Sequence, residues 1–126
     1  MLLFIDANAT VGDVVSPSVG SVAPEAQNLN GDLYHPVLIK HRIALPSTMV
    51  VGKGKSTTWT SGSSLRLAAR RYDYVGVHLH WRACVLDAGV DETIDFGNVN
   101  VDHDAAFVHI AMFLPDSADA ERWRSE

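Results

Sequence analysis

The chain has 126 residues, of which 47% are hydrophobic, enough for the core of a single domain of ordinary size. Its formal net charge of -5 repels a polyanion, so contact with nucleic acid requires a local basic patch or a metal ion. The single cysteine, Cys84, excludes an internal disulfide and any zinc site made of cysteine pairs. It weakly favours a reducing compartment, so we expect an intracellular protein, nuclear or cytoplasmic.

The first predicted element is a buried strand. Residues 2–5 form an apolar run that ends at Asp6. The run is too short for the core of a signal peptide or for a membrane span, so no membrane partner is expected. Residues 14–30 contain prolines, a glycine and many small side chains without a stable period, which predicts a long surface loop.

A helix is predicted next. Asn30 is a candidate N-cap, apolar residues recur after it at helical spacing, and Pro46 is expected to stop the helix. Pro36 does not suit a helix interior, so either the helix begins near His35 or it is kinked. The side chains expected on the helical pattern are those of Leu33, Tyr34, Val37, Leu38, His41 and Leu45.

Further strand-like runs follow the helix, each rich in β-branched, aromatic or apolar residues. Together with the single helix they predict an α/β (α+β) protein. Residues 116–126 are polar and are expected to form a tail outside the domain, which would span residues 1–115. The predicted runs are residues 48–51, 57–60, 72–77, 83–86 and 106–113.

Two motifs have simple interpretations that we prefer. The sequence GKGKST at residues 52–57 lacks a glycine that a phosphate-binding loop requires, and a glycine-rich hairpin turn explains it better. His78 and His80 would share one face of a strand and could join His103 or His109 in a metal site. No third ligand has a supporting spacing, so we expect a position at the rim of the sheet.

A local basic patch has five candidate residues. Runs of charge are most often solvated faces, and we expect this of most of them. The candidates are Arg66, Arg70 and Arg71, and Lys53 with Lys55.

Acidic residues near the end of the chain are harder to explain as surface residues. Asp73 interrupts an apolar strand, and a buried carboxylate is costly unless it is paired or hydrogen-bonded. Asp102, His103 and Asp104 open the last predicted strand. A histidine whose ring is fixed by an aspartate is a common way to set its tautomer and basicity. The alternative is that Asp102 and Asp104 are only turn residues.

Four motifs, in this order, resemble those of the endonuclease/exonuclease/phosphatase superfamily, which includes apurinic/apyrimidinic endonucleases, deoxyribonucleases and retroelement endonucleases. They are IDANA (Ile5 to Ala9), STTWT (Ser56 to Thr60), RYDY (Arg71 to Tyr74) and VDHDA (Val101 to Ala105). The family has a strand ending in G-D-x-N-A, then a T-W strand, an R-x-D-Y strand and S-D-H. The resemblance implies the C-terminal half of a four-layer αββα sandwich, with one mostly antiparallel sheet and a covering helix.

The resemblance also implies hydrolysis of phosphodiester bonds in DNA with Mg²⁺ or Mn²⁺. Asp6 would orient or deprotonate the attacking water, and Asn8 would hydrogen-bond that water or the phosphate. His103 would be an acid/base group on a phosphate oxygen, and Asp73 would orient it. Asp102 would lie beside the metal ion or its waters. The motifs leave open whether Asp6 or His103 is the base.

The chain departs from the family pattern at Ile5, Ala7 and Val101. The family's principal metal-binding glutamate belongs to a first half that the sequence does not include. We therefore expect a fragment with weak metal binding, inactive or nearly so alone, that depends on the missing half or on another protein. The alternatives are a phosphomonoesterase acting on a phosphorylated lipid or inositol, and a non-catalytic interaction module.

Overall fold

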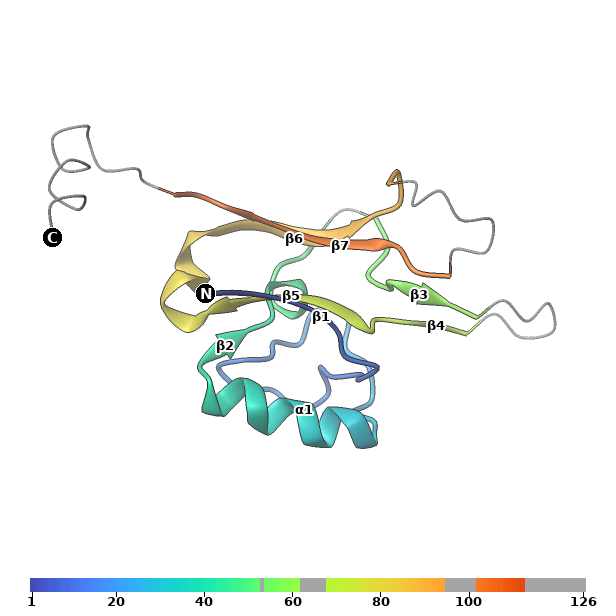
Figure 1. Cartoon of the computed structure of the whole chain (residues 1–126), viewed down its shortest axis with the longest axis horizontal. Coiled ribbons are helices and arrows are strands. Elements are labelled where there is room, and N and C mark those ends of the chain that lie inside the picture. The colour runs from blue at the N-terminus through green and yellow to red at the C-terminus, as the bar shows by residue number, and fades with distance from the viewer. Residues whose placement is uncertain (53, 62–67, 95–101, 113–126) are drawn as a thin grey trace, which may run out of the picture.

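The structure, a computed structural model, describes residues 1–52, 54–61, 68–94 and 102–112. These residues form a mixed α/β fold with antiparallel strand pairs and one long helix, which confirms the predicted class (Figure 1). The elements in chain order are β1 (Leu2–Asp6), α1 (Leu29–Lys40), β2 (Ile43–Ala44), the 3-10 helix η1 (Pro46–Thr48), β3 (Trp59–Thr60), β4 (Ala69–Arg70), β5 (Asp73–His78), the 3-10 helix η2 (Leu79–Cys84), β6 (Val85–Asp91) and β7 (Ala105–Ile110).

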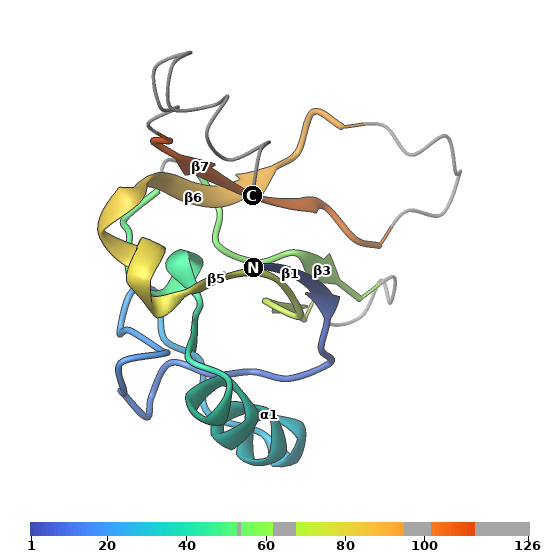
Figure 2. The ribbon, with the colours of Figure 1, turned by 60° about the vertical axis from the view of Figure 1, so that its left-hand side comes forward.

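The strands of the described residues are divided among three sheets, where one was expected. β5 is the central strand of a sheet with the order β1-β5-β2, and β3 pairs with β4 and β6 with β7. All these strand pairs are antiparallel. Helix α1 lies against one face of the three-stranded sheet and the β6–β7 pair lies over the other, as the two ribbon views agree (Figure 1, Figure 2).

The hydrophobic core lies between α1 and the three-stranded sheet. Val19 is fully buried there, although it belongs to a segment predicted to be a surface loop. The hydroxyl of Ser16 accepts hydrogen bonds from the backbone N–H groups of Ser18 and Val19, which turns the chain inward. A loop without secondary structure therefore contributes to the core, whose buried residues are Val11, Val19, Leu38, Ile43, Leu45 and Tyr74.

The N-cap of helix α1 lies two residues before Asn30, the residue predicted to be the cap. The side chain of Asn28 accepts a hydrogen bond from the N–H of Gly31, so Asn28 is the N-cap. The helix continues through Pro36 to Lys40, and the predictions that it begins near His35 or ends at Pro46 are wrong. Pro36 is exposed, so water can reach the carbonyl that the missing N–H leaves without its helical donor.

The buried face of α1 agrees with the predicted pattern at Leu38 but differs from it elsewhere. Gly31, His35 and Leu38 face the core, whereas Leu33 and Val37 are exposed. A Cβ atom at Gly31 would lie 2.3 Å from the carbonyl oxygen of Thr10, so glycine lets the helix approach that segment closely.

His35 is a core residue with both ring nitrogens satisfied. Its Nε2 lies 2.7 Å from the hydroxyl of Ser16, and its Nδ1 lies 3.0 Å from the side-chain oxygen of Gln27. Burial lowers the pKa of His35, which favours the neutral ring. The histidine therefore serves packing and has no free nitrogen for chemistry.

The positions of β1, β5 and β7 were predicted more accurately than those of the other strands. β5 and β7 match predicted runs, although β7 ends at Ile110 within the described residues. The run 48–51 is not a strand, because η1 and its cap occupy its first half. The run 83–86 is divided between η2 and β6, and the two-residue strands β2 and β4 were not predicted.

Replacing Asn28 by alanine should lower the free energy of unfolding by about 1–2 kcal/mol, as measured by urea denaturation. The Asn28 Oδ1 atom accepts from the N–H of Gly31 at 2.8 Å and from the N–H of Thr10 at 3.1 Å, so its loss affects the helix and the adjoining loop. Lys40→Ala, at an exposed position of the same helix, is the control and should change stability by less than about 0.5 kcal/mol. Equal losses in the two variants would contradict the observed cap.

Candidate active site

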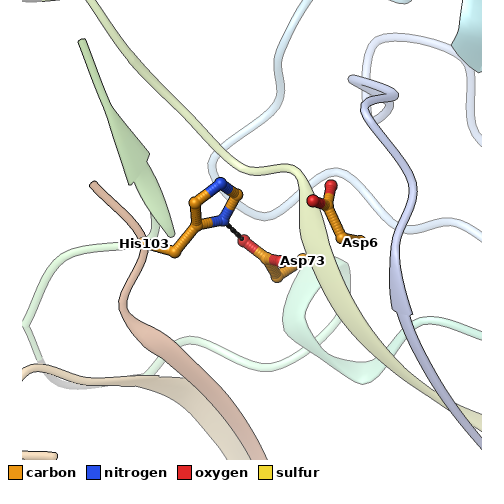
Figure 3. A group of neighbouring side chains, drawn as sticks. All are labelled: Asp6, Asp73 and His103. Atoms are coloured by element: carbon orange, nitrogen blue, oxygen red, sulfur yellow. Dashed lines mark hydrogen bonds and ion pairs between the residues drawn. The ribbon is translucent and has the colours of Figure 1, made fainter. Parts of the chain in front are cut away.

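Three side chains from distant parts of the chain meet at one end of the central sheet (Figure 3). Asp6 ends β1, Asp73 begins β5 and His103 precedes β7. One ligand atom from each lies within 4.8 Å of those of the other two. These are three of the residues that the motifs indicate, and the fold brings them together.

The pairing of β1 with β5 places the two carboxylates. The register sets Asp6 directly opposite Asp73. Side chains of directly opposed residues point to the same face of a sheet, with Cβ atoms about 5 Å apart. Two like charges in this arrangement repel each other, so the pair favours a bound cation or a protonated neighbour.

Thr58 joins the His103 segment to β5, and the sequence pattern gave it no such role. Its backbone carbonyl accepts from the N–H of Asp104 at 2.7 Å. Its buried hydroxyl lies 3.1 Å from the backbone nitrogen of Tyr72 and 3.0 Å from that of Asp73, and accepts from both N–H groups. Its only sequence signal is its place in STTWT, next to the tryptophan. Thr58 therefore fixes the distance between the histidine and its carboxylate partner.

His103 and Asp73 form the central pair of the site. The Nδ1 atom of His103 lies 2.8 Å from the Oδ2 atom of Asp73 and donates to it. Partial burial lowers the pKa of His103, but the hydrogen bond and charge of Asp73, helped by Asp6 and Asp102, raise it above its ordinary value overall. The raised pKa widens the pH range in which the ring carries a second proton, and its Nε2 atom lies on the side of the ring away from Asp73 (Figure 3).

Asp6 is the exposed carboxylate of the cluster. Its Oδ1 atom accepts from the backbone N–H of Asn8 at 3.2 Å. Asn8 has a φ of 47°, in the left-handed region that asparagine tolerates. The carbonyl of Asn8 accepts from the side chains of Asn28 and Asn30. These contacts of Asn8 are made by its backbone, and they fix the turn that carries Asp6.

Asp102, the predicted metal neighbour, lies at the edge of the cluster. Its Oδ2 atom accepts from the indole N–H of Trp59 at 3.2 Å, and its Oδ1 atom lies 3.9 Å from the Nε2 atom of His103. The Trp59 ring packs against Tyr72 with centroids 5.4 Å apart. Asp102 is therefore placed to interact with the Nε2 edge of the His103 ring.

The cluster has a donor set that can hold a divalent cation. Mg²⁺ prefers carboxylate oxygens, keeps several waters and is often bound by one or two carboxylates. Asp6 and Asp73 provide these oxygens, whereas protonated His103 cannot ligate a cation. Asp73 already accepts a hydrogen bond from His103, so the site offers few free oxygens. The residues fit a weakly held Mg²⁺ or Mn²⁺.

The proposed basic patch is largely absent from the described residues. Arg71 is only 1% exposed, so the expectation that it lies on a surface is wrong. Lys55 forms ion pairs with Asp104 and Glu92, which neutralise its charge. Arg70 is exposed. The two other candidates, Lys53 and Arg66, lie outside the described residues.

The two histidines His78 and His80 do not share a strand face. β5 ends at His78, and His80 lies in η2. The Nδ1 atom of His78 accepts from the backbone N–H of His80 at 3.2 Å. Within the residues that the structure covers, the metal-ligand cluster is that of Asp6, Asp73 and His103, so the pair has no metal site with His103 or His109.

No protein-family model matches the chain, and no curated protein or solved structure is significantly similar to it. Among the described residues, no helix has the length and apolar character needed to cross a membrane.

Proposed function

We propose that Asp6, Asp73 and His103 form the phosphate-cleaving part of a metal-dependent phosphodiester hydrolase of the endonuclease/exonuclease/phosphatase type. One observation carries the proposal: three residues far apart in the sequence, each from a different one of the four ordered motifs, have ligand atoms within 4.8 Å of one another at one end of the sheet. DNA is the substrate class that the motifs favour, and the reduced state of a lone Cys84 suits an intracellular protein.

The motifs left open which residue is the acid and which is the base, and our proposal assigns these roles to His103 and Asp6. We assign His103 as the acid because its Nδ1 is bonded to Asp73, which leaves Nε2 free to donate a proton to the leaving oxygen, and the raised pKa of the ring supports this role. Asp6 is the exposed carboxylate and, unlike Asp73, does not accept a hydrogen bond from His103, so we assign it to accept the proton of the attacking water. A new phosphorus–oxygen bond forms as the bond to the leaving oxygen breaks, and Asp73 holds the imidazole in position.

Asp6 and Asp73 would hold Mg²⁺ or Mn²⁺, which when bound supplies positive charge for the non-bridging phosphate oxygens. We expect low metal affinity and slow turnover from this chain, because Asp73 is shared with His103 and the described residues add no further carboxylate to the cluster. A further protein segment that adds a carboxylate to the cluster would raise the metal affinity and the turnover rate.

Replacing Asp6 by asparagine should raise the Mg²⁺ concentration needed for half-maximal hydrolysis by about 10- to 100-fold. The amide keeps the shape of the side chain but removes the charge that binds the cation. The assay is release of p-nitrophenol from bis(p-nitrophenyl) phosphate as Mg²⁺ is titrated.

Asp13→Asn is the control, since Asp13 is an exposed acid whose Oδ1 accepts a backbone N–H of Gln27, a bond that asparagine can keep. Its Mg²⁺ dependence should equal that of the wild type. If Asp6→Asn has the same Mg²⁺ dependence, Asp6 does not bind the activating ion.

A non-catalytic interaction module is the second candidate, and one observation favours it. Leu29, Leu33 and Val37 recur at helical spacing on α1 and are 75%, 67% and 48% exposed. Apolar stripes of this kind often mark protein contacts. A stable stoichiometric complex whose strength is unchanged by substitutions at Asp6 and His103, in a protein without hydrolytic activity, would support this candidate over the hydrolase.

A further inference from the structure

A groove of about 460 Å³ runs from the proposed active site along the strands β1, β5 and β7. Its charged end holds the three site residues, and its other end is apolar. The residues that line it are Phe4, Ile5, Asp6, Asp73, Tyr74, Val75, His103, Asp104, Ala105 and Ala106. The groove therefore offers a phosphate end joined to an apolar end.

Phe4 dominates the apolar end. It is 71% exposed, on the same face of β1 as Asp6 because strand side chains alternate. Its partner across the ladder is Val75, which is buried. None of the aromatic pairs among the described residues includes Phe4. The ring face of Phe4 is thus available within the groove.

We infer that Phe4 is a stacking platform for an aromatic ring attached to the substrate phosphate, an inference that rests on the proposed function. The strand rise of about 3.3 Å per residue sets Phe4 about 7 Å from Asp6 along β1. One nucleotide or a benzyl ester can span this separation. The small side chains of Ala105 and Ala106 in β7 leave room for a ring beside Phe4.

The charges of the groove limit the substrate further. Its acidic and basic lining residues are the carboxylates Asp6, Asp73 and Asp104 together with His103, with no lysine or arginine among them. Asp104 is paired with Lys55. A duplex with many phosphates would meet net negative charge along the groove, whereas one phosphate carrying one ring needs only the metal and His103. The fitting class is a small or single-stranded phosphoester with an aromatic ring.

The test measures equilibrium binding by calorimetry, with Mg²⁺ present, so that it does not depend on turnover. The probes are benzylphosphonate, cyclohexylmethylphosphonate, methylphosphonate and thymidine 5′-phosphate. Wild type should bind the benzyl compound at least about fivefold more tightly than its saturated counterpart, the lower range for aromatic stacking. A further preference for thymidine 5′-phosphate would identify a nucleobase as the ring, and equal affinity would identify a simple aryl group.

Phe4→Ala and Phe4→Leu should both reduce the benzyl-to-cyclohexylmethyl affinity ratio to about one. Leucine keeps an apolar side chain, so its result separates stacking from burial. Leu86→Ala is the matched control, because Leu86 is 68% exposed on β6 and does not line the groove. Its ratio should stay that of the wild type.

Two results would overturn the inference and each has a distinct meaning. If methylphosphonate binds but the benzyl and cyclohexylmethyl compounds bind equally, the apolar end prefers no aromatic ring, and the hydrolase proposal stands without Phe4. If none of the four probes binds, the phosphate site itself is refuted, and the proposed function fails with the inference.

Discussion

Replacing Arg71 by methionine should lower the free energy of unfolding by about 3 kcal/mol or more. The Arg71 side chain is 1% exposed, and its guanidinium donates hydrogen bonds to the backbone carbonyls of Ser47, Val22 and Ala23. Burial lowers the pKa of Arg71, but guanidinium stays charged in proteins. Methionine fills similar space and removes the donors of these three carbonyls, which the guanidinium holds together.

Arg71 also connects loop segments that no strand pairing or helix holds together. Its backbone N–H donates to the Oε2 atom of Glu25 at 2.9 Å, and its guanidinium reaches the 22–23 and 47 segments. The substitution should therefore loosen the loop that carries Val19 into the core. Arg70→Met is the control, since Arg70 is exposed, and should change stability by less than about 0.5 kcal/mol. Urea denaturation that finds the two variants equally stable would contradict this structural role.

Replacing His103 by alanine should reduce hydrolysis of bis(p-nitrophenyl) phosphate by about 100- to 10,000-fold, the range for loss of a general acid. The effect should be on kcat more than on KM, because the proton is transferred in the transition state. His109→Ala is the control, as His109 is an exposed histidine of β7 outside the cluster. A similar loss of rate in both variants would mean that the effect is structural.

The pH profile of hydrolysis tests the assignment of His103 as the acid. The activity of His103 as an acid should be lost as the pH rises through its raised pKa. Asp73→Asn removes the charge that raises this pKa, so the descending limb should move to lower pH. The stabilisation from the ion pair follows the same sign: it is complete below the unfolded pKa and is lost as the pH rises through the folded one. An unchanged limb in Asp73→Asn would refute the assignment of His103 as the acid.

The sequence predicted the strand that holds Asp73 and the strand after His103, because both are long apolar runs with clear boundaries. It could not predict that Asp6 lies opposite Asp73, since strand register depends on pairing between residues far apart in the chain. Asp73 was expected to have a partner because a lone buried carboxylate is costly, and His103 provides it.

The errors have a common physical origin in tertiary contacts. Arg71 is at the end of a charged run and was assigned to a surface, but three carbonyl acceptors from other segments make its burial favourable. The apolar pattern of α1 pointed to Leu33 and Val37, whereas a glycine and a histidine face the core. Close approach at Gly31 and the hydrogen bonds of His35 decide that face, and neither can be seen in a periodic pattern.

The most direct test of the proposed function is the initial rate of p-nitrophenol release from bis(p-nitrophenyl) phosphate by the purified chain, with Mg²⁺ and then with EDTA. The blank is the double variant Asp6→Asn/His103→Ala, purified in the same way. A rate above this blank that requires Mg²⁺ and disappears with EDTA is the predicted result. A wild-type rate equal to that of the blank, at every pH and Mg²⁺ concentration tested, would contradict the hydrolase assignment.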